Sequence, residues 1–173
     1  MIRYRVRLLD LDRHHFEVEC RIDDPAPEQR FSLPAWIPGS YLLRDFARHV
    51  VAVAARSGRD PLPVEKVDAS TWAVRGAGRT LTLTLTVYAL DQSVRGAWLD
   101  RQRGYFNGPC LFVLPEGRDA EAIEVALEPP PHSLCDDWRV ATALTRSNVD
   151  ERSEEHTSEL QSLAYLVCRL LLE

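Results

Sequence analysis

The sequence contains almost no lysine. Lys66 is the single lysine among 21 basic residues, and 26 acidic residues bring the formal net charge to -5. This preference for arginine indicates the codon bias of a GC-rich, bacterial genome. Nucleic-acid phosphates are normally bound by clustered Lys and Arg, and no basic stripe occurs in the chain, so we expect no nucleic-acid partner.

Long apolar runs are absent as well. Met1 is followed by residues that alternate as in a strand, so no signal peptide is visible, and no apolar stretch is long enough to span a membrane. We therefore expect a cytoplasmic protein with no membrane partner. The four cysteines show no CxxC spacing, which favours reduced thiols over a zinc knuckle. They are Cys20, Cys110, Cys135 and Cys168.

The common catalytic motifs are missing. There is no HExxH for a helical zinc site, no GxSxG nucleophile elbow and no GxGxxG. His14 and His15 are adjacent, and adjacent side chains on a strand point to opposite faces, which disfavours a shared metal ion. Gly39-Ser40 lacks the second glycine of an elbow. We therefore assign no catalytic residue, no metal ligand and no cofactor to this chain.

Alternation of apolar and polar residues is the main structural signal. In residues 80–90, Leu81, Leu83 and Leu85 alternate with threonines, which predicts a half-buried strand of an antiparallel sheet. Residues 46–55 are ambiguous, but their β-branched content favours a strand. The other predicted strands are residues 4–8, 16–20, 31–36, 62–67, 71–74, 105–114, 122–127 and 138–144. Many short strands separated by turns predict an all-β protein, an antiparallel β-sandwich over residues 1–151.

The composition changes at the C-terminus. Leucine, alanine and valine recur at helical spacing in residues 160–171, which predicts an amphipathic helix. Residues 152–162 and 166–173, however, resemble two parts of a translated sequencing-library adapter, in the same order and frame. We therefore treat residues 152–173 as a non-native, helical tail and exclude them from the domain.

Two loops rich in large residues remain. In residues 33–41, prolines flank Trp36 and Ile37, and Gly39 permits a turn closed to other residues. A stiff loop that holds Trp36 and Tyr41 either packs at the end of the sandwich or shapes a contact surface, and both interpretations stay open. Residues 91–100 with residues 104–108 form a second region of this kind.

These segments carry a family resemblance. Residues 33–41 (LPAWIPGSY), 44–50 (RDFARHV) and 105–108 (YFNG) resemble the N-terminal region of the glycyl aminopeptidase family. The resemblance also includes Trp72 and residues 87–89, 93–95 and 99–100, and residues 138–142 resemble the family's closing strand. Members of this family are gluzincin zinc metallopeptidases with an N-terminal β domain, a thermolysin-like catalytic domain and a PDZ domain. The structural motif carried by the resemblance comprises Trp36, Pro38, Gly39, Tyr41 and Arg44.

The resemblance implies a non-catalytic N-terminal domain. It would pack on a missing catalytic domain and border the cleft for a peptide substrate. The zinc and its HExxH ligands would belong to the intact enzyme, so the chain by itself should be inactive. Tyr105 and Asn107 would approach the cleft, although Asn107 is equally typical of a turn. The alternative is a stand-alone module that binds peptide or carbohydrate through Trp36, Tyr41, Trp98 and Tyr105.

Overall fold

The computed structural model describes residues 1–37, 40–128, 138–142, 146–150, 153–158 and 167–172. Its largest sheet has eight strands in the order β14 (Arg146–Asp150), β15 (Ser153–Ser158), β12 (Ile123–Glu128), β1 (Ile2–Asp10), β2 (His15–Asp23), β8 (Thr80–Tyr88), β4 (Val50–Ser57) and β5 (Asp60–Leu62). One four-stranded sheet has the order β13 (Trp138–Thr142), β16 (Val167–Leu172), β10 (Arg103–Asn107) and β9 (Ala97–Leu99). The other has the order β11 (Leu114–Pro115), β3 (Glu28–Ser32), β7 (Thr71–Arg75) and β6 (Val64–Lys66).

Two short helices complete the described fold, a 3-10 helix η1 (Phe46–His49) and α1 (Gly108–Leu111). Between the described strands, pairing is antiparallel except where β12 lies parallel to β1, with Ile2 opposite Ile123. The prediction of an all-β, antiparallel sandwich is therefore confirmed, with one parallel pair that the alternation did not reveal. Among the residues described, no helix is both long and apolar enough to cross a membrane.

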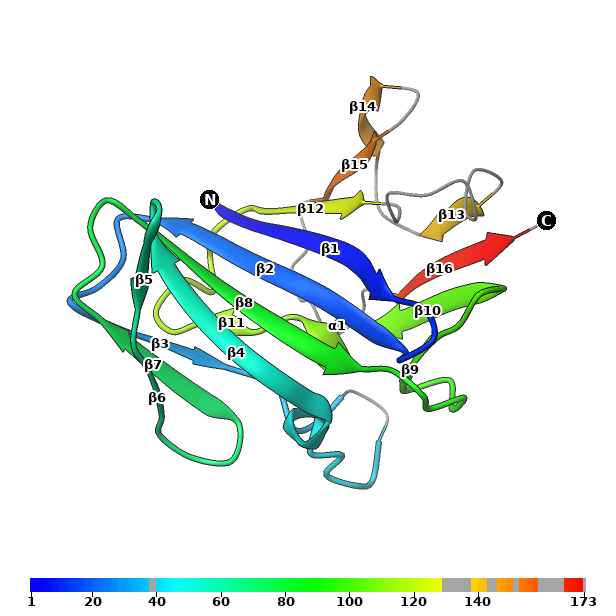
Figure 1. Ribbon diagram of the computed structural model, residues 1–173, viewed down its shortest axis with the longest axis horizontal. Coiled ribbons are helices and arrows are strands. Elements are labelled where there is room, and N and C mark those ends of the chain that lie inside the picture. Colours follow the sequence, from blue (N-terminus) through cyan, green and yellow to red (C-terminus); the bar gives the residue numbers. More distant parts are fainter. Residues whose placement is uncertain (38–39, 129–137, 143–145, 151–152, 159–166, 173) are drawn as a thin grey trace.

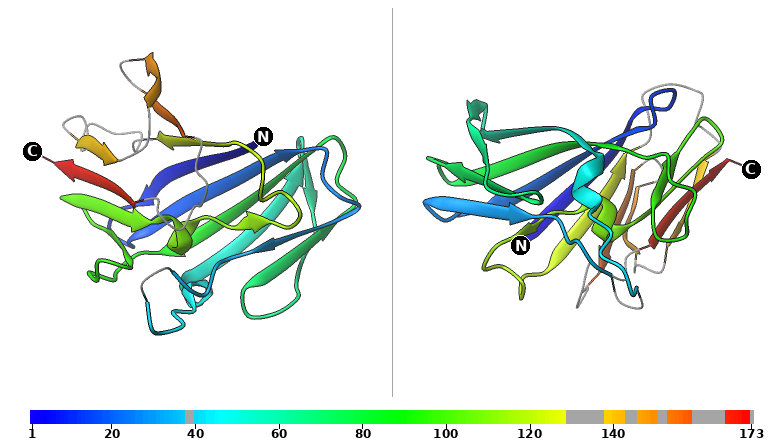
Figure 2. Two further views of the ribbon diagram at one scale, coloured as in Figure 1. Left: turned by 180° about the vertical axis from the view of Figure 1, so that it is seen from behind. Right: turned by 90° about the horizontal axis from the view of Figure 1, so that it is seen from below.

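The eight-stranded sheet is covered on one face. Along β2, Phe16, Val18 and Cys20 are fully buried, whereas the residues between them are partly or fully exposed. The two smaller sheets pack on the buried face, because Phe31 and Trp72 of one and Leu99 and Phe106 of the other belong to the same core cluster as β2 and β8. Figure 1 shows the arrangement of these strands, and Figure 2 shows the domain from behind and from below. The strand predicted at residues 80–90 is observed as β8, with Leu81, Leu83, Leu85 and Val87 in the core.

The opposite face of this sheet carries a ladder of ion pairs. Arg3, Arg5 and Arg7 of β1 alternate with the buried residues and reach carboxylates on β2 and β12. The Arg7 Nε atom lies 2.7 Å from a Glu128 oxygen, and its Nη1 atom lies 2.8 Å from a Glu17 oxygen. Exposed pairs of this kind each contribute little to stability. Their arrangement keeps this face polar and balanced in charge.

An aromatic cluster joins the large sheet to β10 and to the segment after α1. The ring of Tyr4 lies 4.7 Å from that of Phe112, and Phe106 lies 5.6 Å from Phe16 and 5.8 Å from Phe112 between ring centroids. The Tyr4 hydroxyl donates a hydrogen bond of 2.6 Å to the carbonyl oxygen of Val113. Edge-on and tilted pairs at these distances stabilise a core beyond the area that they bury.

Some predicted strands end elsewhere. The strand predicted for residues 105–114 is wrong over residues 108–113, because Pro109 lacks an amide donor and occupies the first turn of α1, while Leu114 begins β11. In residues 46–55 the first four form η1, and the predicted strand begins at Val50 as β4. The strand predicted for residues 31–36 is β3, which lies earlier and ends at Ser32 before Pro34.

The helical prediction for the tail is wrong where the structure describes it. Residues 153–158 form β15 against β12, and residues 167–172 form β16 between β10 and β13. Strand pairing gives the main-chain groups of β10 and β12 hydrogen-bonding partners, and this tertiary gain overrides the helical spacing of the leucines. The first half of the predicted helix falls in residues 159–166, which lie outside the described residues.

The aromatic cluster generates a stability prediction. Tyr4→Phe removes the donor to the buried carbonyl of Val113 and should lower the free energy of unfolding by about 1–3 kcal/mol. Tyr88→Phe deletes the same hydroxyl from an exposed side chain and is the matched control. Urea denaturation followed by tryptophan fluorescence measures both variants. Equal stabilities for the two variants would contradict the role given to Tyr4.

Candidate functional site

The loop of residues 33–45 is closed by its own hydrogen bonds. The Trp36 indole N–H donates to the carbonyl of Ser40 at 2.7 Å, and the amide of Arg44 donates to the carbonyl of Ala35 at 2.7 Å. Ile37 is buried and anchors the loop in the core. Trp36 is half exposed and Tyr41 fully exposed, so neither side chain serves mainly as core packing.

Ser40 is a turn residue and has no arrangement for nucleophilic chemistry. Its hydroxyl donates to the carbonyl of Leu42 at 3.0 Å and accepts from the Leu42 amide, while the Arg44 Nε atom lies 3.5 Å away. Asp45 follows in the left-handed region with φ of 44°, which Asp tolerates better than most residues. Of the predicted motif, Pro38 and Gly39 lie outside the described residues.

Tyr105 and Asn107 both point at the loop of residues 91–96. The Tyr105 hydroxyl lies 2.8 Å from the carbonyl oxygen of Asp91 and 2.9 Å from that of Ser93. The Asn107 amide donates to the carbonyl of Val94 at 2.7 Å, and only 7% of Asn107 is exposed. The observed contacts therefore make these residues supports of the loop.

Two residues that the sequence did not single out complete this support. The Cys110 thiol of α1 donates to the carbonyl of Arg95 at 3.4 Å. Gly96 packs against the Asp91 side chain so closely that a Cβ atom would lie 2.6 Å from the Asp91 Cγ. The Asp91 carboxylate in turn accepts the Ser93 amide at 2.9 Å, an Asx turn that D-x-S could have signalled.

The titratable groups nearby are engaged in structure. Burial raises the pKa of Cys110 to about 12, so its thiol stays protonated. Burial opposes ionisation of Asp100, but hydrogen bonds from the Gln102 and Arg103 amides and the Trp98 indole outweigh it and lower the Asp100 pKa. Burial, with Arg48 beside it, lowers the pKa of His49 and favours its neutral form.

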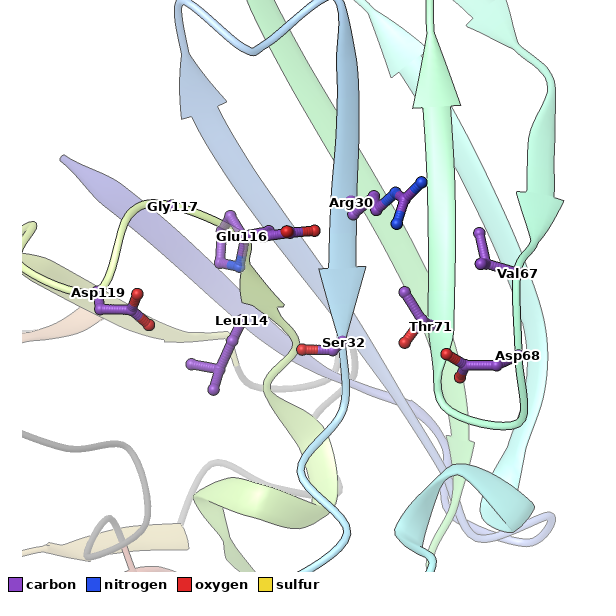
Figure 3. Close-up of a pocket in the computed structure, with 10 residues that line it drawn as sticks. Arg30, Ser32, Val67, Asp68, Thr71, Leu114, Glu116, Gly117 and Asp119 are labelled. Carbon is purple, nitrogen blue, oxygen red and sulfur yellow. The ribbon is translucent and has the colours of Figure 1, made fainter.

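A groove of about 360 Å³ lies beside β3, β7 and β11 (Figure 3). Ser32 and Thr71 offer hydroxyls, Arg30 is a cation, and the three acidic residues that line it are Asp68, Glu116 and Asp119. None of its lining residues is His or Cys, so neither hydroxyl has an imidazole base in the groove. Arg30 is already paired with Glu28 at 2.9 Å. The groove therefore shows a mixed polar surface without a reaction centre.

The described residues contain no group of three or more His, Cys, Asp or Glu side chains that could hold a metal ion. The rings of His14 and His15 each lie 6.1 Å from the ring of Tyr88. His14 is also hydrogen-bonded through Nδ1 to the carbonyl of Leu99, so its ring helps to fix the β1–β2 turn beside β9. A zinc site of the kind that the family resemblance implies does not fit these residues.

The support of the 91–96 loop can be tested by proteolysis. Asn107→Ala leaves the Val94 carbonyl without its donor, which should cost about 1–3 kcal/mol and raise the rate of tryptic cleavage after Arg95 about five- to hundredfold. Gln92→Ala removes an exposed amide from the same loop and is the control. Mass spectrometry of early digestion products measures both rates, and unchanged cleavage in Asn107→Ala would contradict this assignment.

Comparison with solved structures identifies proteins of the same fold. An aminopeptidase N family protein from Idiomarina loihiensis is 34% identical with a TM-score of 0.91, over 98% of this chain and 29% of that chain. The M1 zinc metallopeptidase E323A mutant from Deinococcus radiodurans has a TM-score of 0.58 at 12% identity, over 98% of this chain and 41% of that chain. Leukotriene A4 hydrolase from Saccharomyces cerevisiae has a TM-score of 0.52 at 12% identity, over 98% of this chain and 28% of that chain.

The chain thus spans well under half of each of these proteins. Comparison with curated proteins found no match. The family described as Peptidase M61 N-terminal domain matches residues 3–167, nearly the whole chain. The predicted resemblance to the N-terminal domain of an aminopeptidase family is confirmed at this level. The chain belongs to the peptidase M61 N-terminal domain family.

Proposed function

We propose that this chain is the non-catalytic N-terminal domain of a zinc metallo-aminopeptidase of the glycyl aminopeptidase family. The observation that carries the proposal is the family match, which covers residues 3–167. The alignment with the Idiomarina relative covers only 29% of that protein. The domain packs on a catalytic domain and borders the cleft that takes the N-terminal end of a peptide. Zinc belongs to that catalytic domain and supplies an activated water there when bound.

The relatives support a second domain. One relative is a two domain M1 zinc metallopeptidase, and this chain covers 41% of it. The larger remaining part of such a polypeptide is where metal ligands would lie, because the described residues of this chain offer no cluster that could hold an ion. This chain then contributes shape and contacts, and the second domain contributes the chemistry.

Tyr105 and Asn107 take an indirect part in this proposal. Their polar atoms are occupied by the carbonyl oxygens of residues 91–94, so they act as positioning residues for the loop at the border of the cleft. A stand-alone module would need exposed aromatic side chains. Trp98 and Tyr105 are only partly exposed and have internal hydrogen bonds, which leaves Trp36 and Tyr41 and disfavours that alternative.

We also propose that residues 152–173 are translated adapter and not native sequence. The support is the resemblance of residues 152–162 and 166–173 to such a translation. The family match runs on to residue 167, so the part of it that bears on native sequence is residues 3–151. Formation of β15 and β16 by these residues is compatible with that origin, because strand pairing depends on main-chain hydrogen bonds that any non-proline residue supplies. In the intact protein, native residues would pair with β10 and β12.

The absence of catalysis is testable on the chain itself. The purified protein should bind zinc only weakly and should not hydrolyse aminoacyl substrates, because a structural or catalytic zinc needs three or four converging ligands. Equilibrium dialysis with metal analysis and a fluorogenic aminoacyl amide assay measure the two properties. Stoichiometric zinc that survives dialysis, or turnover that chelators abolish, would refute the proposal.

The genomic locus provides the second test. Re-sequencing across the codons for residues 145–160 should give an open reading frame that departs from the present sequence near residue 151 and continues into an HExxH motif. The motif is expected because two imidazoles one helical turn apart hold the zinc of this class of peptidase. An in-frame stop near residue 151, with no metallopeptidase sequence downstream, would count against the proposed function. A locus that encodes residues 152–173 as given would count against the adapter origin of the tail.

A further inference from the structure

Exposed apolar side chains gather in two loops. Eleven large apolar side chains of the described residues are exposed, and six of them lie in the loops of residues 33–45 and 90–96. These six form what we call the apolar end: Trp36, Tyr41, Leu42, Leu43, Leu90 and Val94. Tyr41 is fully exposed, Leu43 and Val94 are each 79% exposed, and Leu42 is 67% exposed. Single exposed apolar residues are ordinary, whereas a cluster marks an interaction surface.

The two loops lie at the same end of the domain. Figure 1 shows the loop that precedes η1 and the loop between β8 and β9 toward the lower edge of the molecule. η1 contacts α1, and Phe46 and His49 line a small cavity together with Asp91 and Gly96. An open hollow of about 650 Å³ lies between η1 and the 90–96 loop, lined by Arg48, His49, Leu90, Asp91, Gln92 and Trp98. The apolar end therefore combines protruding side chains with a hollow that a partner's side chain can enter.

Hydrogen bonds between described residues hold both loops. The 33–45 loop is closed by the Trp36–Ser40 and Arg44–Ala35 hydrogen bonds, and the 90–96 loop by those from Asn107 and Cys110. Loops held in this way keep their leucines out of the core, so the apolar area stays in contact with water. Each Å² of it that a partner buries contributes about 25 cal/mol of favourable free energy. A partner that covers this end recovers that free energy with little loss of loop entropy.

The outer face of the eight-stranded sheet is less suited to an apolar contact than the apolar end. The outer face of the eight-stranded sheet carries the Arg3, Arg5 and Arg7 ladder, whose charges are already paired. The remaining exposed apolar side chains include Leu9 and Val51, which lie outside the two loops. The apolar end is thus the described surface best suited to a large, dry contact.

We propose that the apolar end is the surface on which the second domain of the intact polypeptide docks. This assignment rests on the proposed function, which supplies the occupant. In the two domain M1 zinc metallopeptidase of the same fold, the part outside the match is larger than the part inside it, which is the size of domain that the apolar end would receive. The partner surface is a complementary apolar patch that inserts a side chain between η1 and the 90–96 loop.

Hydroxyl-radical footprinting tests the docking surface. The 173-residue chain and the intact polypeptide from the same locus are oxidised in parallel, and the modified side chains are quantified by mass spectrometry. Oxidation of Tyr41, Leu43 and Val94 should fall about tenfold in the intact polypeptide, because the centre of an interface excludes water. Leu9 and Val51 are exposed outside the apolar end and should react equally in both proteins.

Each other outcome has a distinct meaning. Equal oxidation of Tyr41 and Leu43 in both proteins, in a polypeptide that contains the second domain, overturns the docking surface and leaves the proposed function standing. Protection that appears in the 173-residue chain as its concentration rises makes a second copy the occupant and also overturns the assignment. A locus without a second domain overturns the proposed function, and the docking surface with it.

A variant pair provides an independent readout. In the intact polypeptide, Tyr41→Ser with Leu43→Ser should separate thermal unfolding into two calorimetric transitions, because the domains lose their coupling. Leu9→Ser with Val51→Ser makes the same kind of change outside the apolar end. This control should unfold with the same profile as the unsubstituted polypeptide. All four side chains are exposed, so the domain itself should remain folded. An unchanged profile in the first variant would contradict the docking surface.

Discussion

The aromatic contact between the large sheet and the segment around α1 is the constraint on which the rest of the structure depends. Phe106 touches Phe16 on one side and Phe112 on the other, and Tyr4 closes the cluster through its hydroxyl. Phe106 belongs to β10 and Phe112 follows α1, so the cluster fixes both ends of this short helix. The core therefore also fixes the position of the 91–96 loop, which α1 and β10 support.

Packing in the core thereby positions the loops of the proposed docking surface. Asn107 is the residue after Phe106, and Cys110 lies one turn into α1; their side chains hold the 91–96 loop. α1 also contacts η1, which carries the end of the 33–45 loop. In the proposed function, a domain without a metal-ligand cluster among its described residues contributes to catalysis by presenting two apolar loops to a neighbouring domain. Rigid contact surfaces lose less entropy on binding, which favours a defined geometry at a shared cleft.

Local alternation predicted the strands whose two faces differ. β8 was predictable because its leucines and threonines alternate over the whole element. The end of β10 was not predicted, although Pro109 provided a signal. The strand state of residues 167–172 opposes their helical spacing, because pairing with β10 and β13 is a long-range interaction that no local pattern encodes. Asn107 was predicted as a site residue, but its partner Val94 lies thirteen positions away and only the fold brings them together.

The proposed docking surface depends most directly on the rigidity of the apolar end before any partner is present. Amide hydrogen exchange of the 173-residue chain measures this for the N–H groups of Ser40, Arg44 and Gly96, each of which donates to a carbonyl within its own loop. Exchange at least about a hundredfold slower than in an unstructured peptide would support the claim. Exchange at the rate of an unstructured peptide would show loops that order only on contact, and would contradict it.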